Sequence, residues 1–314
     1  MEINYIILAH KNPAQLKRLI HRLNSVGNYF YVHVDRNCPI EQFEREIDEK
    51  DNIFFLRDQQ RKTVVWGDFS MVEATLNALL QLKKDRRKGY CILLSGQDYP
   101  LKSSADIAKY LSQNNGTHFI DFFNFPYEWD ENYLNRITKY KINKSSNRGH
   151  FLLLSSVFEK NFYCHETAGK ISYLIKTKKF KPLLKIFKKR SFPGNIKPFV
   201  GGQWWAFPME TIHKILQFVK MNPGYMKFHH YTLCADEIFF HSILLHIARE
   251  ENQKIKPSLT YNNWVRKSGP LPVTFTTSDF EELRLAANDK LFARKFDIDK
   301  DENVLDLIDN FLLK

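Results

Sequence analysis

The sequence lacks a hydrophobic run long enough to cross a bilayer, which takes roughly 20 apolar residues. Its first segment, MEINYIILAHK, has a short apolar run that reaches His10 and Lys11 too soon for a signal peptide or a membrane anchor. We therefore expect a cytoplasmic protein, one that charge could hold at a membrane surface.

Cysteine is scarce and paired aspartates are missing where a metal would need them. Four cysteines are present, with no CxxC or CxxH spacing, so neither a zinc site nor a disulfide scaffold is predicted. Asp35 in HVDRN and Asp98 in GQDYP each stand alone after a strand-like run, without a DxD motif. This argues against a metal ion site, and we predict no metal and no cofactor.

Positive charge is in excess, with a formal net charge of +12. Such a protein can bind nucleic acid, an anionic membrane or a phosphorylated substrate. The chain carries no helix-turn-helix, RRM or KH signature, so nucleic acid is not the expected partner. The lysine-rich stretch 176–190, interrupted by Pro182, suits anionic lipid headgroups better than base readout, and a solvated loop is an equal alternative.

The first hundred residues alternate between strand and helix patterns. Apolar runs at 3–8, 29–34, 53–56 and 90–94 predict strands, and helical spacing follows residue 12 and covers 70–82. This order predicts an α/β fold with a mostly parallel sheet flanked by helices. Ligands of such sheets bind beyond the carboxyl ends of the strands, where His10, Asp35 and Asp98 are expected.

The second half carries weaker signals. Residues 121–150 are aromatic and charged with little periodicity, which indicates a long surface excursion. A helix is predicted over 236–248, with Asp236 and Glu237 at its start. Carboxylates there are typical of helix capping, and the alternative is that one acts as a general base.

Two basic pairs near the C-terminus, Arg266–Lys267 and Arg294–Lys295, could neutralise a diphosphate leaving group. A solvated basic face is the alternative. Lys295 is the stronger candidate because Phe292 and Phe296 flank it.

The segment GGQWW, residues 201–205, combines adjacent glycines with two tryptophans. Glycines allow close backbone approach, and tryptophan faces stack on sugar rings. A Gly-Gly turn followed by a buried tryptophan pair explains the same pattern.

Seven segments occur in one order between residue 4 and about residue 297: YIILAHKNPAQLKRLIHRL, YVHVDRN, VVWGDFSMVEATLNALL, YCILLSGQDYPLKS, GGQWWAF, ADEIFFHSIL and LFARKFD. In this order they resemble the core-2/I-branching N-acetylglucosaminyltransferase and peptide O-xylosyltransferase family, glycosyltransferase family 14. ADEIFFH and FARKF are most similar to the xylosyltransferases and their bacterial relatives, which indicates a bacterial member.

The resemblance implies a GT-A-like α/β fold in a single large domain, residues 1–314, with a C-terminal extension. Residues 1–120 would form the nucleotide-binding half and residues 121–314 the acceptor and catalytic half. It also implies an inverting, metal-independent transfer from a UDP-sugar.

The family's roles fall on particular residues of this sequence. The catalytic base falls on Glu237 and the diphosphate-binding lysine on Lys295. The position of a further family arginine is ambiguous within YNNWVRKSGPLPVTF, where Val273 aligns and Arg266 or Lys267 would reach in. Nucleotide contacts fall on Ala9, His10, Asp35, Val65 and Trp66. The acceptor cleft is expected at Asp98, Gln203, Trp204, Trp205 and Asp236.

The expected reaction transfers GlcNAc, or next xylose, to a hydroxyl of a glycan or a lipid-linked glycan at the inner membrane face. A peptide O-xylosyltransferase-like activity on serine is one alternative. A non-catalytic protein that binds a sugar nucleotide or glycan is another.

Overall fold

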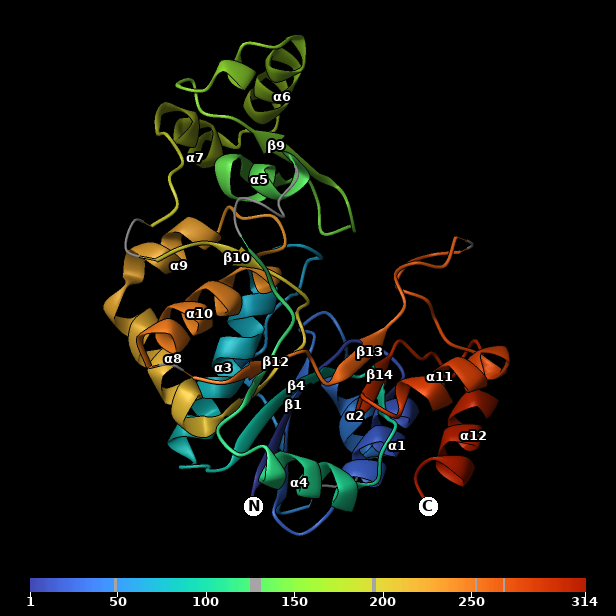
Figure 1. The fold of residues 1–314 in the computed structure, drawn as a ribbon. Coiled ribbons are helices and arrows are strands. Elements are labelled where there is room, and N and C mark those ends of the chain that lie inside the picture. Colours follow the sequence, from blue (N-terminus) through green and yellow to red (C-terminus); the bar gives the residue numbers. More distant parts are fainter. Residues whose placement is uncertain (48–49, 125–130, 194–195, 252, 268) are drawn as a thin grey trace.

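The structure is a computed structural model that describes residues 1–47, 50–124, 131–193, 196–251, 253–267 and 269–314. Its main element is a seven-stranded sheet with the strand order β12-β6-β11-β4-β1-β2-β3 (Figure 1). The strands span β1 Ile3–Ala9, β2 Asn28–Val34, β3 Ile53–Phe55, β4 Tyr90–Ser95, β6 His118–Phe119, β11 Ala206–Pro208 and β12 Ile255–Lys256.

Strand β1 lies at the centre of the parallel part of the sheet. It pairs with β2 and β4 in parallel, with Ala9 opposite Val34 and Leu8 opposite Ser95. β3 continues this direction, whereas β11 runs antiparallel to β4 and β6. The sheet confirms the predicted α/β class. Because parallel strands end together, the carboxyl ends of β1, β2 and β4 form one edge, called the carboxyl edge below.

Both faces of the sheet are covered, and every residue of β1 is buried. Alternate side chains point to opposite faces: Ile3, Tyr5 and Ile7 join one hydrophobic core, and Ile6 and Leu8 join the other. A continuous apolar run therefore serves two cores at once.

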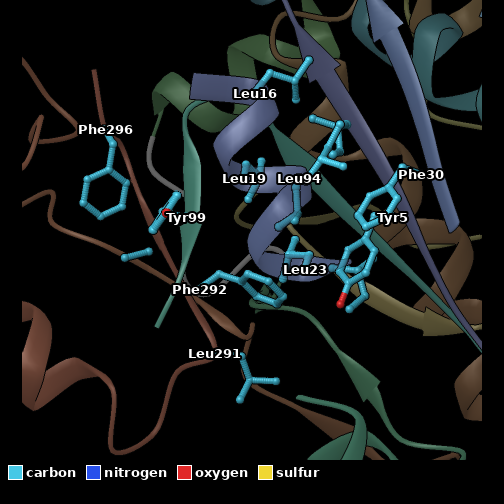
Figure 2. Close-up of a cluster of buried hydrophobic side chains, with 14 of the residues drawn as sticks. Tyr5, Leu16, Leu19, Leu23, Phe30, Leu94, Tyr99, Leu291, Phe292 and Phe296 are labelled. Carbon is cyan, nitrogen blue, oxygen red and sulfur yellow. The ribbon is translucent and has the colours of Figure 1, made fainter. Parts of the chain in front are cut away.

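The first core contains the aromatic rings of Tyr5 and Phe30, stacked with 5.3 Å between their centroids (Figure 2). Leu16, Leu19 and Leu23 cover them from α1, at the spacing that gives a helix one apolar face. The helices of this core are α1 (Pro13–Leu23), α2 (Ile40–Glu46), α4 (Ser104–Gln113), α11 (Phe280–Ala286) and α12 (Asn303–Phe311).

The second core includes Trp205, whose ring stacks on Phe207 with 4.4 Å between centroids. Trp205 is 2% exposed, so its ring is part of the hydrophobic core, as the alternative of a buried tryptophan predicts, and its role in binding an acceptor stays a prediction. The helices of this core are α3 (Ser70–Lys84), α8 (Met209–Met221), α9 (Pro223–His229) and α10 (Phe239–Glu251).

A second sheet brings the C-terminal part of the chain to the carboxyl edge. It joins β13 (Thr260–Asn262), β14 (Phe292–Arg294) and β5 (Asp98–Pro100) in the order β13-β14-β5. Since β5 follows β4 directly, its antiparallel pairing with β14 places Arg294 opposite Asp98.

An inserted lobe, which begins with α5 at Glu131, stands beyond the sheet in Figure 1. It has a small core of its own and contains α5 (Glu131–Thr138), β8 (Tyr140–Asn143), β9 (Phe151–Leu154), α6 (His165–Lys176) and α7 (Phe180–Leu183). The surface excursion predicted over 121–150 forms part of this lobe, with α5 and β8 as regular elements within it, and residues 125–130 lie outside the described residues. At its base, the short strands β7 (Phe123–Asn124) and β10 (Phe199–Val200) pair antiparallel.

The lobe is attached to the sheet domain by a buried ion pair. Lys141, 3% exposed, donates to Asp68 at 2.9 Å, and Asn143 donates to the same oxygen at 2.7 Å. Burial alone would raise the pKa of Asp68, but Lys141 and these hydrogen bonds outweigh it and lower that pKa. The described helices include none that is both long enough and apolar enough to traverse a bilayer.

Candidate active site

The loops after the parallel strands are joined at the carboxyl edge. The amide of Asp35 donates to the carbonyl of Ala9 at 2.8 Å, and that of Gly96 donates to Leu8 at 2.9 Å. His10 follows Ala9 and is exposed. Partial desolvation and the neighbouring Lys11 lower the pKa of His10. The structure thus brings the strand-end residues that the sequence predicted, Ala9, His10 and Asp35, to one edge.

Asp35 organises the loop that carries two other predicted residues. Its carboxylate accepts the amides of Asn37 and Val64, both at 2.8 Å. Val65 and Trp66 follow, and the indole of Trp66 is 42% exposed. The guanidinium of Arg148, from the β8–β9 connection of the lobe, lies 4.9 Å from the centre of the Trp66 ring. This places a lobe cation against the predicted nucleotide loop.

Lys295 lies in a group of cations at the same edge. Burial lowers the pKa of Lys295, and Arg148, Arg294 and Lys11 lower it further, against the opposing effect of Asp297. Asp297 is already paired with Lys11 at 2.5 Å. The side chain of Lys295 is half-buried, and no hydrogen bond from its Nζ is found among the described residues. This group of cations is suited to binding an anion.

Arg294 and Asp98 form a buried pair next to these cations. The Nε of Arg294 lies 3.7 Å from Oδ1 of Asp98, which is 0% exposed, and the guanidinium lies 4.0 Å from the centre of the Trp204 ring. Burial raises the pKa of Asp98, and Arg294 opposes this. Neither Oδ1 nor Nε has a hydrogen-bond partner within the described residues, and neither does the buried amide nitrogen of Gln203. Buried polar atoms are normally paired, so these atoms mark a place where a polar ligand could bind.

The predicted carboxylate pair belongs to a short 3₁₀ turn, Ala235–Glu237, and α10 begins only at Phe239. The predicted helix start at 236 is therefore wrong, because Ile238 has a φ of −125° that separates the turn from the helix. The turn is fixed from both sides: Cys234 donates to the carbonyl of Gly67 at 3.0 Å, and Gly201 donates to that of Glu237 at 2.9 Å.

The carboxylate of Glu237 lines a cavity of about 810 Å³. Arg136, from α5 of the lobe, forms an ion pair with its Oε2. Burial alone would lower the pKa of Arg136, but Glu237 reverses this and keeps the guanidinium charged. The cavity also has Asp121, Tyr133 and Trp264 in its wall, and its size is that of a small-ligand site.

Asp236 links the cavity to the cations. Burial raises the pKa of Asp236 well above that of an ordinary aspartate, and Glu237 adds to the effect. Its Oδ1 has no hydrogen-bond partner within the described residues. Asp236 acts electrostatically on Arg294, so a continuous group of charges runs from Lys295 through Arg294 to Asp236 and Glu237.

This raised pKa predicts a pH-dependent stability difference between the wild type and Asp236→Asn. The folded protein holds the Asp236 proton more tightly than the unfolded chain, so rising pH destabilises the wild type from about pH 3.9 up to the raised pKa. We expect the stability of the variant relative to wild type to increase by about 1.4 kcal/mol per pH unit in that window, then level off. Urea unfolding of both proteins across the pH range measures this. A difference independent of pH would contradict the raised pKa.

Glycine is required at position 201 because the backbone of Asp121 passes close to it. A Cβ on Gly201 would lie 1.8 Å from the carbonyl oxygen of Asp121, whereas one on Gly202 would meet nothing nearer than 3.9 Å. We expect Gly201→Ala to lower the free energy of unfolding by about 3 kcal/mol or more, because backbone must move. Gly202→Ala is the matched control and should stay within about 1 kcal/mol of wild type in denaturant unfolding. Equal stability of the two variants would exclude the steric explanation.

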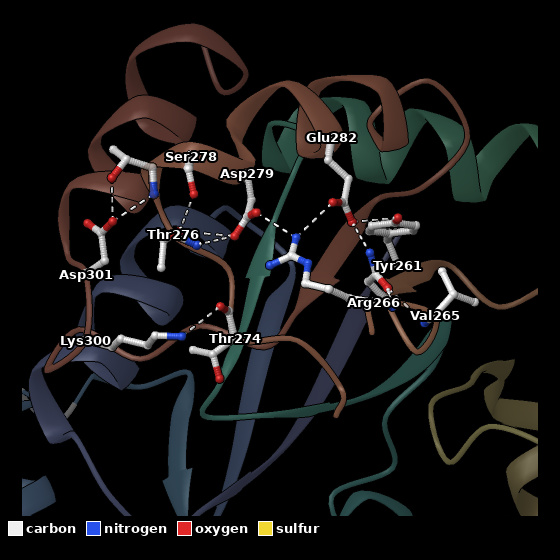
Figure 3. Close-up of polar contacts among 12 residues, drawn as sticks. Tyr261, Val265, Arg266, Thr274, Thr276, Ser278, Asp279, Glu282, Lys300 and Asp301 are labelled. Carbon is white, nitrogen blue, oxygen red and sulfur yellow. Dashed lines mark hydrogen bonds and ion pairs between the residues drawn. The ribbon is translucent and has the colours of Figure 1, made fainter. Parts of the chain in front are cut away.

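Arg266 and Lys267 do not belong to the cation group around Lys295. Figure 3 shows the guanidinium of Arg266 directed at Asp279, 2.6 Å away, and Glu282, 3.2 Å away. Arg266 thus forms ion pairs with α11 and the turn before it, and its role in holding a diphosphate stays a prediction. Lys267 is exposed.

Three cations of the site were missed from the sequence: Lys11, Arg136 and Arg148. Arg136 and Arg148 lie in the segment interpreted as a surface excursion, and no local pattern distinguishes them from other exposed arginines. Trp264 of the cavity wall was also missed, although it lies in the segment YNNWVRKSGPLPVTF. Within the described part of the chain, no three His, Cys, Asp or Glu side chains form a group that could hold a metal ion.

The mostly parallel α/β sheet thus has a carboxylate and a cation group at its carboxyl edge, where ligands of such sheets bind. In a comparison with family models, residues 3–287 match the model described as Core-2/I-Branching enzyme. The chain belongs to the Core-2/I-Branching enzyme family.

Curated relatives include xylosyltransferase 2 of Rattus norvegicus, 22% identical over 98% of this chain, and xylosyltransferase sqv-6 of Caenorhabditis elegans, 22% identical over 91%. The aligned region is 33% of each of those proteins, so the chain spans about a third of their length. Among solved structures, apo mouse xyloside xylosyltransferase 1 aligns over 93% of this chain and 96% of its own, with 9% identity and a TM-score of 0.34.

Proposed function

We propose that this protein transfers a sugar from a UDP-sugar to a hydroxyl group, with inversion at the anomeric carbon and without a metal ion. The observation that carries the proposal is the Glu237 carboxylate, paired with Arg136 in an 810 Å³ cavity and linked through Asp236 to the cations around Lys295. A base and a diphosphate site are the two parts that this chemistry needs.

The nucleotide would bind to the half formed by residues 1–120. Ala9, His10 and Asp35 are at the strand ends, and Val65 and Trp66 are on the loop that Asp35 holds. The exposed ring of Trp66 offers a stacking surface for the base.

The diphosphate would lie on Lys295, with Arg148, Arg294 and Lys11 around it. Fixed cations stabilise the charge that develops on the leaving diphosphate, which is the task a divalent ion performs in metal-dependent enzymes. Support comes from the lowered pKa of Lys295, which reports several positive charges close together in a partly desolvated place.

The chemical step would use Glu237 as a general base. Its carboxylate takes the proton of the acceptor hydroxyl while that oxygen bonds to the anomeric carbon, and the bond from this carbon to the phosphate oxygen breaks with its electrons going to UDP. Attack from the face opposite the diphosphate inverts the carbon. Arg136 would orient the carboxylate through its ion pair.

The acceptor would occupy the cavity of the half formed by residues 121–314. Trp264 and Tyr133 line it. Asp236, Asp98, Gln203 and Trp204 would face the donor, next to Arg294. A glycan or lipid-linked glycan is the acceptor that we propose first. GlcNAc is the donor sugar proposed first, and xylose second.

The curated relatives favour one specific second candidate, a peptide O-xylosyltransferase-like activity in which a serine hydroxyl replaces the sugar hydroxyl. They are xylosyltransferases, and the ADEIFFH and FARKF segments resemble that side of the family and its bacterial members.

A thermal-shift panel of UDP-sugars in the presence of EDTA tests the donor site. One UDP-sugar should raise the melting temperature without metal, the shift should persist in Glu237→Gln, and it should vanish in Lys295→Ala. A shift that requires Mn²⁺, or none with any UDP-sugar, would overturn the metal-free site. Binding without turnover on any acceptor would support the non-catalytic sugar-nucleotide-binding alternative.

A further inference from the structure

The tip of the inserted lobe carries large apolar side chains on its surface. Phe158, Tyr163, Phe180, Leu184 and Phe187 are each more than half exposed, and these five residues are called the lobe tip below. Five such side chains within 30 positions of one small lobe are unusual, because exposed apolar residues are normally scattered singly. We propose that the lobe tip is a docking surface for an anionic lipid bilayer.

Three of the five side chains share one side of a short helical segment. α7 runs directly into the 3₁₀ turn Leu184–Phe187, and Phe180, Leu184 and Phe187 are spaced four and three residues apart along it. This spacing places side chains on the same face. Ile186, from the other side of the turn, is 5% exposed and belongs to the core of the lobe.

Hydrogen bonds at Val157 hold the other two side chains, Phe158 and Tyr163, next to this face. The amide of Val157 donates to the carbonyl of Ile186 at 2.9 Å, and the hydroxyl of Tyr163 donates to the carbonyl of Val157 at 2.9 Å. Phe158 follows Val157, and Phe187 follows Ile186. The five residues therefore form one surface rather than separate exposures.

Charge complementarity identifies the occupant. Residues 157–190 contain nine lysines and one arginine against two glutamates, a net charge of +8. Glu159 pairs with Lys189 and Glu166 with Lys170, so the segment offers no further carboxylate to its other lysines. In an interfacial membrane contact, lysines bind the lipid headgroups, and phenylalanine and leucine side chains insert below them. Nucleic acid or an acidic polysaccharide would use the lysines and leave the apolar side chains in water.

The lobe connects this surface to the candidate active site. Lys141 of the lobe pairs with Asp68, and Arg136 pairs with Glu237. Docking would hold the site close to the bilayer. The inference does not depend on the proposed reaction, because lipid binding is measured without any substrate.

Sedimentation with phosphatidylcholine vesicles, with and without phosphatidylglycerol, tests the proposal on the full chain. We expect the wild type to bind the anionic vesicles, and the triple variant Phe180→Ser, Leu184→Ser and Phe187→Ser to bind at least about tenfold more weakly. A second variant, Lys181→Glu, Lys185→Glu and Lys188→Glu, should lose the preference for anionic lipid.

Leu285→Ser with Phe311→Ser is the matched control, because these side chains are 60% and 66% exposed but belong to α11 and α12. It should bind vesicles as the wild type does, and thermal unfolding should show every variant folded. Vesicle binding equal in the wild type and the lobe-tip triple variant would overturn the proposal. So would wild-type binding to DNA or heparin without binding to anionic vesicles.

Discussion

Glu237→Gln is expected to lower kcat for sugar transfer by about 10²- to 10⁴-fold, the range typical for loss of a general base. The amide is nearly isosteric with the carboxylate but cannot accept the proton of the acceptor hydroxyl. Donor binding should persist, because the cations around Lys295 are untouched. Initial rates of product formation, with KM for donor and acceptor determined separately, measure the effect.

Glu210→Gln is the control for this variant. Glu210 is an exposed carboxylate in the first turn of α8, outside the cavity. It should leave kcat within about twofold of wild type, since surface substitutions away from a site are usually neutral. A Glu237→Gln enzyme with wild-type kcat would mean that another group takes the proton, and the proposed mechanism would be wrong.

Lys295→Ala is expected to lower kcat/KM for the donor by about 10²- to 10³-fold, comparable with the loss of one preorganised donor at a developing negative charge. The alanine removes the central cation of the group that contains Arg148, Arg294 and Lys11. Both ground-state binding of UDP and stabilisation of the leaving diphosphate should suffer. Calorimetric titration with UDP in EDTA, together with steady-state kinetics, separates the two contributions.

Lys267→Ala is the matched control, because it removes the same charge from an exposed position. It should retain wild-type affinity for UDP. If Lys267→Ala weakened binding as much as Lys295→Ala, net charge rather than a particular site would explain the effect. If added Mn²⁺ restored Lys295→Ala fully, the assignment of the diphosphate to fixed cations would fail.

Much of the fold could be predicted because its strands are local and buried. The runs at 3–8, 29–34 and 90–94 correspond to β1, β2 and β4, since strands covered on both faces are continuously apolar. The stretch 176–190 does not form one continuous helix, as predicted, but the break is not at Pro182: α6 ends at Lys176, and Pro182 lies inside α7, which begins at Phe180. The helix α5 and the hairpin of the lobe were not predicted individually, because they are short and only partly buried.

The site could be predicted only where it coincides with strand ends or with a motif. Asp35 and Asp98 follow strands, and Glu237 and Lys295 occur in segments whose order along the chain resembles a family. The GGQWW segment shows the limit. Gly201 is explained by the backbone of Asp121, while Trp205 lies in the core and Trp204 lies under Arg294. Both tryptophans are buried in the second core, and Trp204 differs in its contact with Arg294.

The sequence by itself determined the α/β class, the strands whose ends form the carboxyl edge, and the family, because these depend on local periodicity and on motif order. Only the tertiary structure decided which charges meet. Arg136 reaches Glu237 across 101 positions, and Arg148 reaches Trp66 from the lobe, whereas Arg266 turns to Asp279. Such pairings depend on how the lobe and the second sheet pack against the carboxyl edge, and packing between distant segments leaves no periodic signal in the chain.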